Sequence, residues 1–315
     1  MLNHEAYQLC VRSTARCETL RIATTEIDGA KLIDAGVSVT GSTEAGLIMA
    51  RVCLGDAAEV TIVNENADRF CSDVSVMVRT DNPVRACLGG QYAGWPVSVD
   101  KFFAMGSGPM RMARGREAVL EQLGLIESPD HIAGVLESGT LPTADVMQAI
   151  AADCGVAPDR LAIMIAPAGS LAGTVQVVAR SVETALHKLH ELDFDVQTIF
   201  SAVGVAPLAP PAKPSDTIGG IGRTNDAILY GGRVTLWVDC EQDAVDAVAE
   251  SVPSSASKDH GRPFAAIFKD YEYDFYKVDP HLFSPAVVQI INRRTGKSRR
   301  FGSIETDILR ASFGL

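Results

Sequence analysis

The sequence predicts a mixed α and β fold, of the α/β class, built as two domains. The 315 residues suffice for two domains or one large one, and 47% hydrophobic with 21% charged residues is a typical globular composition. Short β-branched runs alternate along the chain with stretches of helical period. We expect one domain to contain residues 1–90 and 160–240, and the other to contain residues 91–159 and 241–315.

Individual elements follow from periodicity and from the turn residues that flank each run. Strands are predicted at residues 58–63, 71–78, 160–166, 233–238 and 286–291. Helices are predicted at residues 44–55, 115–124, 143–155 and 174–189. The proline-rich sequence of residues 206–215 predicts an extended connector.

Two segments of the chain resemble each other. Residues 32–55 and residues 161–186 each run from an apolar strand through Gly-Ser to Ala-Gly and into an apolar helix. The matching pairs are Gly41-Ser42 with Ala45-Gly46, and Gly169-Ser170 with Ala172-Gly173. An internal duplication with its helices packed together would produce this pattern, although Gly and Ser are also common turn residues.

Charge and cysteine content narrow the class of function. A net charge of −11 argues against nucleic acid or an anionic membrane as the main partner and suits a cationic substrate. Seven cysteines without Cys-x-x-Cys spacing indicate reduced thiols in a cytoplasm. The first twenty residues lack the apolar block of a secretory leader, and the uncharged residues 161–179 are interrupted by proline and glycine. We therefore expect a cytoplasmic protein without a membrane span.

The helix predicted at residues 174–189 carries a polar strip beside its apolar face. The apolar face comprises Val178, Ala179, Val182, Ala185, Leu186 and Leu189, and it predicts core packing. The strip along its edge comprises Arg180, Glu183, His187 and His190. The side left for solvent comprises Ser181, Thr184, Lys188 and Glu191. An ordinary surface ion pair and a functional site both fit the strip.

Three further stretches combine glycine with polar or aromatic residues. Residues 91–124 place two aromatic residues and the turn at 106–109 (Gly-Ser-Gly-Pro) before a helix, which fits a binding loop for an anion or a flat ring, or a plain turn. Residues 221–234 fit a binding segment or a polar turn that caps a short helix. Residues 292–303 hold five basic residues and predict a hairpin tip, either a solvated edge or a contact for an anionic substrate tail.

Patterns of metal and serine chemistry are missing from the sequence. His187 and His190 have the helical spacing of two ligands, but the chain has neither a His-Glu-x-x-His motif nor a Cys/His cluster. A Gly-x-Ser-x-Gly nucleophile elbow is also missing. The sequence therefore predicts no metal ion and no serine nucleophile.

Five segments, in this order and at this spacing, carry a resemblance to a known family. They are residues 86–95 (ACLGGQYAGW), 104–111 (AMGSGPMR), 178–189 (VARSVETALHKL), 221–232 (IGRTNDAILYGG) and 279–296 (DPHLFSPAVVQIINRRTG). They span nearly the whole chain and resemble methenyltetrahydromethanopterin cyclohydrolases, enzymes of archaeal methanogenesis and of formaldehyde oxidation in methylotrophic bacteria. The resemblance implies two α/β domains with a large pocket between them, assembled as a homotrimer.

The resemblance also implies an activity and a set of site residues. Family enzymes reversibly hydrolyse 5,10-methenyltetrahydromethanopterin to its 5-formyl form in one-carbon metabolism, without a metal ion or an organic cofactor. The matching helix supplies a catalytic arginine and glutamate, which fall on Arg180 and Glu183. The substrate-binding residues implied by the motifs are Gln91, Tyr92, Trp95, Ser107, Gly108, Asn225 and Asp226. The chain departs from the expected motifs at Gly90, where a small polar residue is expected, and at Met110, where alanine is expected.

Two other functions fit the same residues. One is a cyclohydrolase that acts on the folate analogue, because the pterin and arylamine portions of the two coenzymes are shared in outline. The other is a non-catalytic pterin-binding subunit of a one-carbon enzyme complex. Arg180 and Glu183 favour an enzyme over a carrier, since a carrier has no need of a carboxylate at that point.

The implied reaction suits a carboxylate. The methenyl carbon bridges two nitrogens and is already an electrophilic cation, so attack requires an activated water more than a Lewis acid. Glu183 would take a proton from that water, and the tetrahedral adduct would then collapse by breaking the bond to the arylamine nitrogen. The protonated Glu183 would return its proton to that nitrogen, while Arg180 would hold the carboxylate in place and favour its ionised form.

Overall fold

A computed structural model describes residues 1–213 and 216–315 and divides them into two compact units. Unit 1 comprises Met1–Ala58 and Arg85–Gln176, and unit 2 comprises Glu59–Val84 and Val177–Leu315. Pro214 and Ser215, the last two residues of the predicted connector, lie outside the described residues. Each unit contains a six-stranded mixed sheet, which confirms the predicted fold class.

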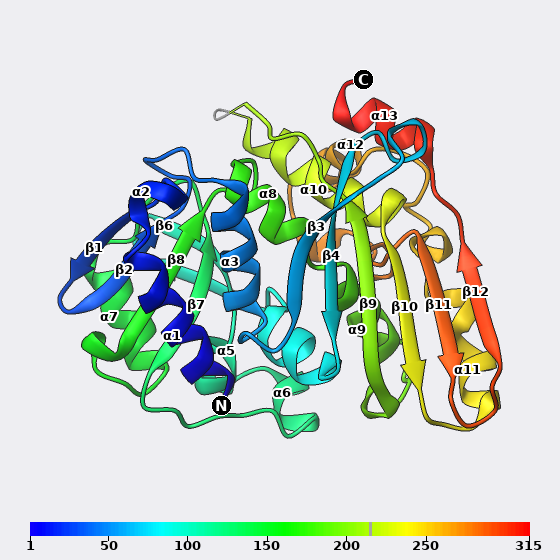
Figure 1. Cartoon of the computed structure of the whole chain (residues 1–315), viewed down its shortest axis with the longest axis horizontal. Coiled ribbons are helices and arrows are strands. Elements are labelled where there is room, and N and C mark those ends of the chain that lie inside the picture. Colours follow the sequence, from blue (N-terminus) through cyan, green and yellow to red (C-terminus); the bar gives the residue numbers. More distant parts are fainter. Residues whose placement is uncertain (214–215) are drawn as a thin grey trace. The chain divides into compact units, whose positions relative to one another are not determined.

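Unit 1 is built around a sheet of strand order β1-β2-β8-β7-β6-β5 (Figure 1). Its strands are β1 (Ala23–Ile27), β2 (Ala30–Asp34), β5 (Trp95–Val99), β6 (Phe102–Ser107), β7 (Ile132–Glu137) and β8 (Leu161–Ala166). Its helices are α1 (Leu2–Thr14), α2 (Cys17–Leu20), α3 (Thr43–Cys53), α5 (Met110–Arg114), α6 (Ala118–Gln122), α7 (Ala144–Asp153) and α8 (Leu171–Val178), with the π-helix η1 (Val84–Gln91). The three central strands β2, β8 and β7 run parallel, and the outer pairs are antiparallel.

The parallel strands of unit 1 are covered on both faces. Every residue of β8 is buried, as expected for a central parallel strand between two helical layers. Ala162, Met164 and Ala166 pack in a cluster with residues of α1 and α3. The alternate residues Leu161 and Ile163 pack in a second cluster with α7. Unit 1 is therefore a three-layer α/β structure with two apolar cores.

Unit 2 has a sheet of strand order β12-β11-β10-β9-β4-β3, with its helices mainly on one side (Figure 1). Its strands are β3 (Glu59–Asn64), β4 (Val74–Thr80), β9 (Ile199–Pro207), β10 (Arg233–Val238), β11 (Val287–Asn292) and β12 (Ser298–Gly302). Its helices are α4 (Ala67–Phe70), α9 (Ser181–Glu191), α10 (Thr217–Gly231), α11 (Gln242–Val248), α12 (Phe264–Asp270) and α13 (Thr306–Phe313). Burial alternates along β10, which indicates that one face of the sheet is covered and the other is partly open.

The division into units differs from the predicted one. Residues 91–159 belong with the N-terminal segment because β7 pairs in parallel with β8, which in turn pairs in parallel with β2. Residues 241–315 belong with residues 177–240 because β10 pairs in parallel with β11. Sequence periodicity predicts where strands occur but not which strands pair. For both segments, pairing with a strand distant in the sequence determines the unit to which the segment belongs.

The helix predicted at residues 174–189 is two helices. α8 ends at Val178 and α9 begins at Ser181, with Arg180 as the N-cap residue in a non-helical conformation (φ −84°, ψ 6°). The predicted start of the connector is also wrong, since Ala206 and Pro207 complete strand β9. The other predicted strands and helices are found, although α6 is shorter than residues 115–124 and β4 begins three residues later than residue 71.

The internal similarity has a structural cause within unit 1. β2 and β8 are adjacent parallel strands, and each leads to a helix that begins after Gly-Ser. Ser42 Oγ accepts a hydrogen bond from the amide of Ala45 at 3.0 Å, and Ser170 Oγ accepts one from the amide of Gly173 at 3.1 Å. Both serines therefore cap a helix in the same way. A Cβ atom at Gly46 would lie 2.8 Å from the carbonyl oxygen of Ala172, so the two helices approach closely there.

Candidate active site

Arg180 and Glu183 lie at the start of α9 in unit 2, and both are buried. Arg180 is 6% exposed and Glu183 is 4% exposed, which excludes the ordinary surface ion pair. Residues three apart share one side of a helical turn, and the N-terminal end of a helix favours a negative charge. The Arg180 amide donates to the carbonyl oxygen of Val177 at 3.0 Å, so the turn before α9 satisfies that donor. The site is thus a buried cation and a buried carboxylate on one helical turn.

The burial of side chains around α9 agrees with the prediction only in part. The six predicted apolar residues from Val178 to Leu189 are all fully buried, as expected. The predicted solvent side is wrong for Ser181 and Lys188, which are 0% and 2% exposed. Lys188 Nζ donates to the carbonyl oxygen of His281 at 2.9 Å, and burial lowers the pKa of Lys188 to about 8. The packing partner lies far along the chain, so the local pattern could not reveal it.

A glycine in the sheet allows α9 to approach closely. Gly204 of β9 lies under the first turn of α9, and a Cβ atom there would be 2.4 Å from Ser181 Oγ and 2.7 Å from Val182 Cγ2. Those distances are too short for any side chain. The first turn of α9, which includes Glu183, therefore rests on bare backbone of the sheet.

The predicted binding residues of unit 1 lie on η1, β5 and β6 and on the loops that follow η1 and β6. Gln91 ends η1 and is fully buried, and Tyr92 follows it with partial exposure. Trp95 begins β5 and packs under the guanidinium of Arg114, whose Cζ lies 4.3 Å from the ring centroid. Ser107 is buried, with its Oγ atom 3.3 Å from Cys53 Sγ.

Gly108 connects the two predicted binding segments of unit 1. Its amide donates to the carbonyl oxygen of Gly90 at 2.8 Å. Gly108 has a φ of +98°, and a Cβ atom there would lie 3.0 Å from the Cα atom of Gly134. Glycine is therefore required both by the backbone conformation and by the close approach to β7.

Both departures from the family motifs have a packing reason. A Cβ atom at Gly90 would lie 2.5 Å from the carbonyl oxygen of Cys53, so this chain has no room for a side chain there. Met110 is fully buried and occupies the space left by Gly106 and Gly134, whose added Cβ atoms would fall 2.8 Å and 2.1 Å from its side-chain atoms. The longer side chain is accommodated because these two neighbours have none.

Asn225 and Asp226 lie inside α10 rather than in a polar turn. Of the two alternatives for this segment, the polar capping turn is wrong, because the helix runs through to Gly231. Asn225 Nδ2 donates to the carbonyl oxygen of Ile221 in the same helix at 2.8 Å. Asp226 is fully buried, and its Oδ1 atom accepts from the amide of Phe264 at 2.8 Å. Asp226 therefore fixes the start of α12 against α10.

Burial raises the pKa of Asp226 to about 7, against the opposing effects of Ser312 and the Phe264 amide. A raised carboxyl pKa adds stability below the usual value near 3.8, and this stability is lost as the pH rises through 7. Replacing Asp226 by asparagine keeps the acceptor and removes the titration. We expect urea denaturation to show that Asp226→Asn gains about 1–3 kcal/mol relative to the wild type between pH 4 and pH 8. Parallel stability curves for the two proteins over this range would contradict the assignment.

His187 and His190 lie on α9, where sequence spacing made them candidate metal ligands. His187 Nε2 lies 3.8 Å from Glu191 Oε1, one turn further along α9. Across residues 1–213 and 216–315, the structure shows no group of three or more His, Cys, Asp or Glu side chains placed to hold a metal ion.

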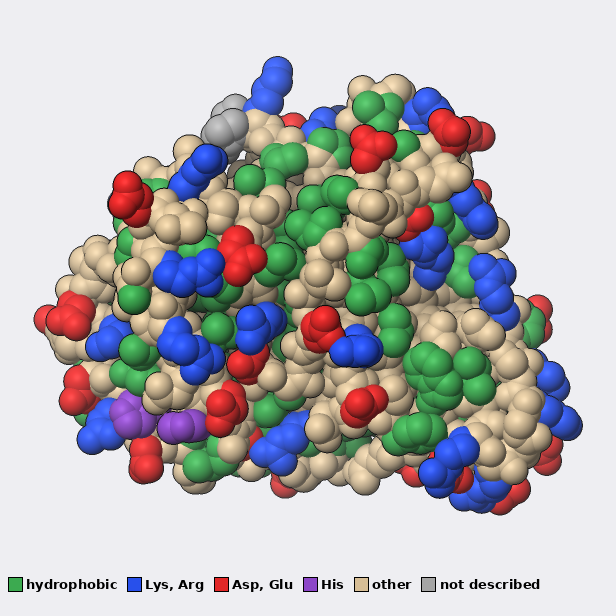
Figure 2. Space-filling view, viewed as in Figure 1, with side chains coloured by type: hydrophobic (Ala, Val, Ile, Leu, Met, Phe, Trp, Pro, Cys, Tyr) green, Lys and Arg blue, Asp and Glu red, His purple; other side chains and the backbone are tan. Residues whose placement is uncertain are grey.

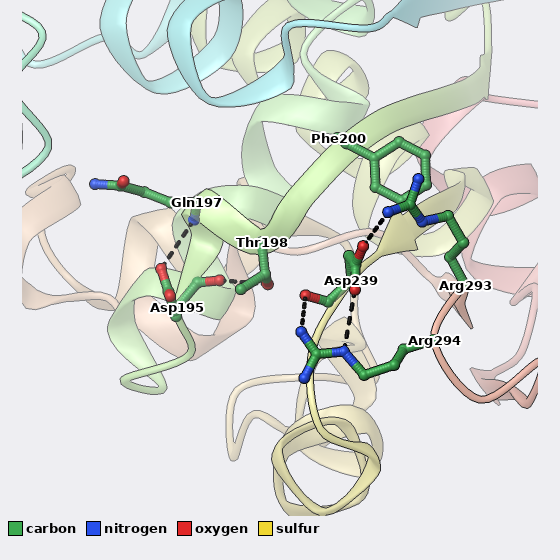
Figure 3. Close-up of a pocket in the computed structure, with 7 residues that line it drawn as sticks. All are labelled: Asp195, Gln197, Thr198, Phe200, Asp239, Arg293 and Arg294. Atoms are coloured by element: carbon green, nitrogen blue, oxygen red, sulfur yellow. Dashed lines mark hydrogen bonds and ion pairs between the residues drawn. The ribbon is translucent and has the colours of Figure 1, made fainter.

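A surface pocket in unit 2 lies apart from the predicted site residues of that unit. It is lined by Asp195, Gln197, Thr198, Phe200, Asp239, Arg293 and Arg294 (Figure 3). The predicted hairpin tip is confirmed, because residues 293–297 connect β11 to β12. Its arginines are paired with carboxylates, since Arg293 contacts Asp239 and Arg294 Nε lies 3.1 Å from Asp239 Oδ1. This pairing favours the solvated edge over a contact for an anionic tail.

The surface carries mixed charge. Acidic and basic side chains are interspersed with apolar ones on the face shown in Figure 2, as expected for a chain with a modest negative net charge. Among the residues that the structure describes, no helix is long and apolar enough to cross a membrane. The uncharged stretch 161–179 instead forms β8, a turn and α8.

The fold and the site define an α/β protein with an arginine and a glutamate buried together at the start of one helix. The family model described as Cyclohydrolase (MCH) matches residues 1–313. The methenyltetrahydromethanopterin cyclohydrolase of Rhodopirellula baltica is 62% identical over 292 residues, covering 92% of this chain and 87% of its own. The enzyme of the same name from Methanothermobacter marburgensis is 40% identical over 320 residues, covering 100% and 99%. The chain belongs to the methenyltetrahydromethanopterin cyclohydrolase family, as the sequence motifs predicted.

Proposed function

We propose that this chain reversibly hydrolyses 5,10-methenyltetrahydromethanopterin to 5-formyltetrahydromethanopterin. The observation that carries the proposal is the burial of Arg180 and Glu183 on the first turn of α9, in a chain that matches the cyclohydrolase family over residues 1–313. The names of the relatives favour the methanopterin coenzyme over its folate analogue, and an enzyme over a carrier subunit.

In the proposed mechanism Glu183 is the general base and then the general acid. Its carboxylate takes a proton from the water that attacks the methenyl carbon, and its negative charge stabilises the bound cation. The new C–O bond gives a tetrahedral adduct, which breaks its bond to the arylamine nitrogen as Glu183 returns the proton to that nitrogen. The hydroxyl group of the adduct then releases its proton to solvent and becomes the formyl carbonyl, so the overall reaction liberates one proton. Arg180 orients the carboxylate and favours its ionised form. The residues proposed to bind the coenzyme are Gln91, Tyr92, Trp95, Ser107, Gly108, Asn225 and Asp226.

The direct test follows the loss of methenyl absorbance with the two pterin coenzymes in parallel. Hydrolysis of the methanopterin coenzyme at a higher kcat/KM than the folate analogue is the expected result. Faster hydrolysis of the folate compound would favour the analogue enzyme instead, and coenzyme binding without turnover of either would favour the carrier.

The reaction is proposed to need no metal ion or organic cofactor. The substrate carbon is already cationic, so a carboxylate suffices to activate the water. Activity is expected to survive exhaustive chelation, and metal analysis is expected to show no stoichiometric metal in the purified chain. Loss of one zinc equivalent per chain together with activity would contradict this prediction and would make His187 and His190 candidate ligands.

The chain is also proposed to act as a homotrimer in the cytoplasm. The trimer rests on the family resemblance alone, and the cytoplasmic location rests on the seven cysteines, none of which forms a disulfide within the described residues. Light scattering is expected to give three times the chain mass of 33.5 kDa. A stable monomer at micromolar concentration would contradict the trimer.

A further inference from the structure

Arg111 is a fully buried arginine in unit 1 that the proposed mechanism does not use. It lies on α5, directly after the turn that contains Ser107 and Gly108. Burying a guanidinium is costly unless all of its donors are satisfied and its charge is balanced. The contacts of Arg111 show how this cost is met.

The guanidinium of Arg111 binds the end of the π-helix η1. Its Nη1 atom lies 3.3 Å, 3.1 Å and 3.2 Å from the carbonyl oxygens of Leu88, Gly89 and Gly90. These three carbonyl groups lie in the last turn of η1, where a helix leaves acceptors unpaired and favours a positive charge. The preceding carbonyl, that of Cys87, accepts instead from the amide of Tyr92 at 2.9 Å. Because η1 ends at Gln91, these carbonyl groups lie beyond the reach of a further helical turn, and Arg111 supplies hydrogen-bond donors to them.

The remaining donors of Arg111 bind Glu117. Arg111 Nε lies 2.8 Å from Glu117 Oε1, and Nη2 contacts Glu117 Oε2, so the pair is bidentate. Glu117 in turn fills the space beside Gly94, where a Cβ atom would lie 2.2 Å from Glu117 Oε2. The carboxylate therefore balances the buried charge and also packs against the bend that follows Tyr92.

One face of the guanidinium packs on Tyr92. The Cζ atom of Arg111 lies 5.0 Å from the centroid of the Tyr92 ring, within the range of a cation–π contact. The carbonyl oxygen of Gly90 accepts from both Arg111 and the amide of Gly108, so the two predicted binding segments meet there. Arg111 therefore binds the backbone directly before Gln91 and also packs on the ring of Tyr92.

We propose that Arg111 is a positioning residue for coenzyme binding, which acts by fixing Gln91 and Tyr92 at the end of η1. This inference rests on the proposed function, because it assumes that Gln91 and Tyr92 contact the pterin coenzyme. Arg111 is fully buried and its guanidinium binds protein atoms, so its loss should change the placement of the binding residues and leave the chemistry of Glu183 in place. We therefore expect the loss of Arg111 to raise KM and to leave kcat nearly unchanged.

The test compares Arg111→Lys and Glu117→Gln with the wild type in steady-state hydrolysis of methenyltetrahydromethanopterin. Lysine keeps the charge, but one ammonium group cannot bind three carbonyls and a bidentate carboxylate together. We expect Arg111→Lys to raise KM about tenfold or more, with kcat changed by less than about threefold. Glu117→Gln leaves Arg111 in place with a weaker partner, so a smaller increase in KM is expected.

Leu9→Ala is the matched control for a general loss of stability. Leu9 is buried on α1 in the core of the same unit, so its truncation lowers the thermal midpoint without altering η1. This variant is expected to keep the wild-type KM. Wild-type KM values in folded Arg111→Lys and Glu117→Gln would overturn the positioning role. Wild-type protein that shows no hydrolysis would instead contradict the proposed function, so the two failures are distinguishable.

Discussion

Replacing Glu183 by glutamine is expected to lower turnover by roughly 10²–10⁴ while the coenzyme still binds. Glutamine keeps the size and much of the hydrogen bonding of glutamate, but it cannot take a proton from water. Glu183 is 4% exposed, so the variant changes a buried group without creating a cavity. Single-turnover and steady-state rates, together with a binding titration of the coenzyme, measure the two effects separately.

Two variants of the same helix sharpen this test. Glu183→Asp draws the carboxylate back by one methylene, on the order of 1 Å, and about 10²-fold is expected to be lost through misplacement. Glu191→Gln removes an exposed carboxylate at the other end of α9 and is expected to leave turnover unchanged. Near-normal turnover in folded Glu183→Gln would return α9 to a purely structural role and would refute the mechanism.

Replacing Arg180 by leucine is expected to give the second largest loss, about 10²-fold in turnover, because the carboxylate loses the group that orients it. The ionised form of Glu183 would also lose a neighbouring cation, so the acid limb of the pH–rate profile should move to higher pH. Rates measured from pH 5 to pH 9 check both effects.

Arg180→Lys is the control for charge alone. It keeps the positive charge but not the planar fork, so its acid limb should stay near that of the wild type while turnover falls. An unchanged acid limb in Arg180→Leu would show that Arg180 does not act on Glu183.

Periodicity predicted the parts of the molecule that are governed by local packing. The apolar face of α9 and the strands β3, β8, β10 and β11 follow directly from spacing and β-branched composition. The break before α9 escaped prediction because Arg180 lies only slightly outside helical conformation, so the apolar spacing continues across it. The catalytic candidates were identified by motif resemblance, and their burial could not be deduced from the helix pattern.

Features that depend on distant partners were missed. Lys188 is buried because its ammonium group reaches the carbonyl oxygen of His281, 93 residues away. Arg111 was noted only as part of a motif, since its acceptors are backbone carbonyl groups of a π-helix that no periodicity indicates. The division into units followed strand pairing, which the sequence does not specify. A single sequence reveals the faces of elements much better than it reveals which buried polar groups meet.

The lack of a side chain at Gly204 affects how closely α9 approaches strand β9. β9 presents Ala202, Gly204 and Ala206 at alternate positions on its buried side, so its side chains there are no larger than a methyl group, and Gly204 has none. At Gly204 the distance between strand β9 and the first turn of α9 is therefore set by backbone atoms of the strand. An added methyl group at Gly204 would clash with Ser181 Oγ and Val182 Cγ2, so the first turn of α9, which carries Glu183, would have to adjust.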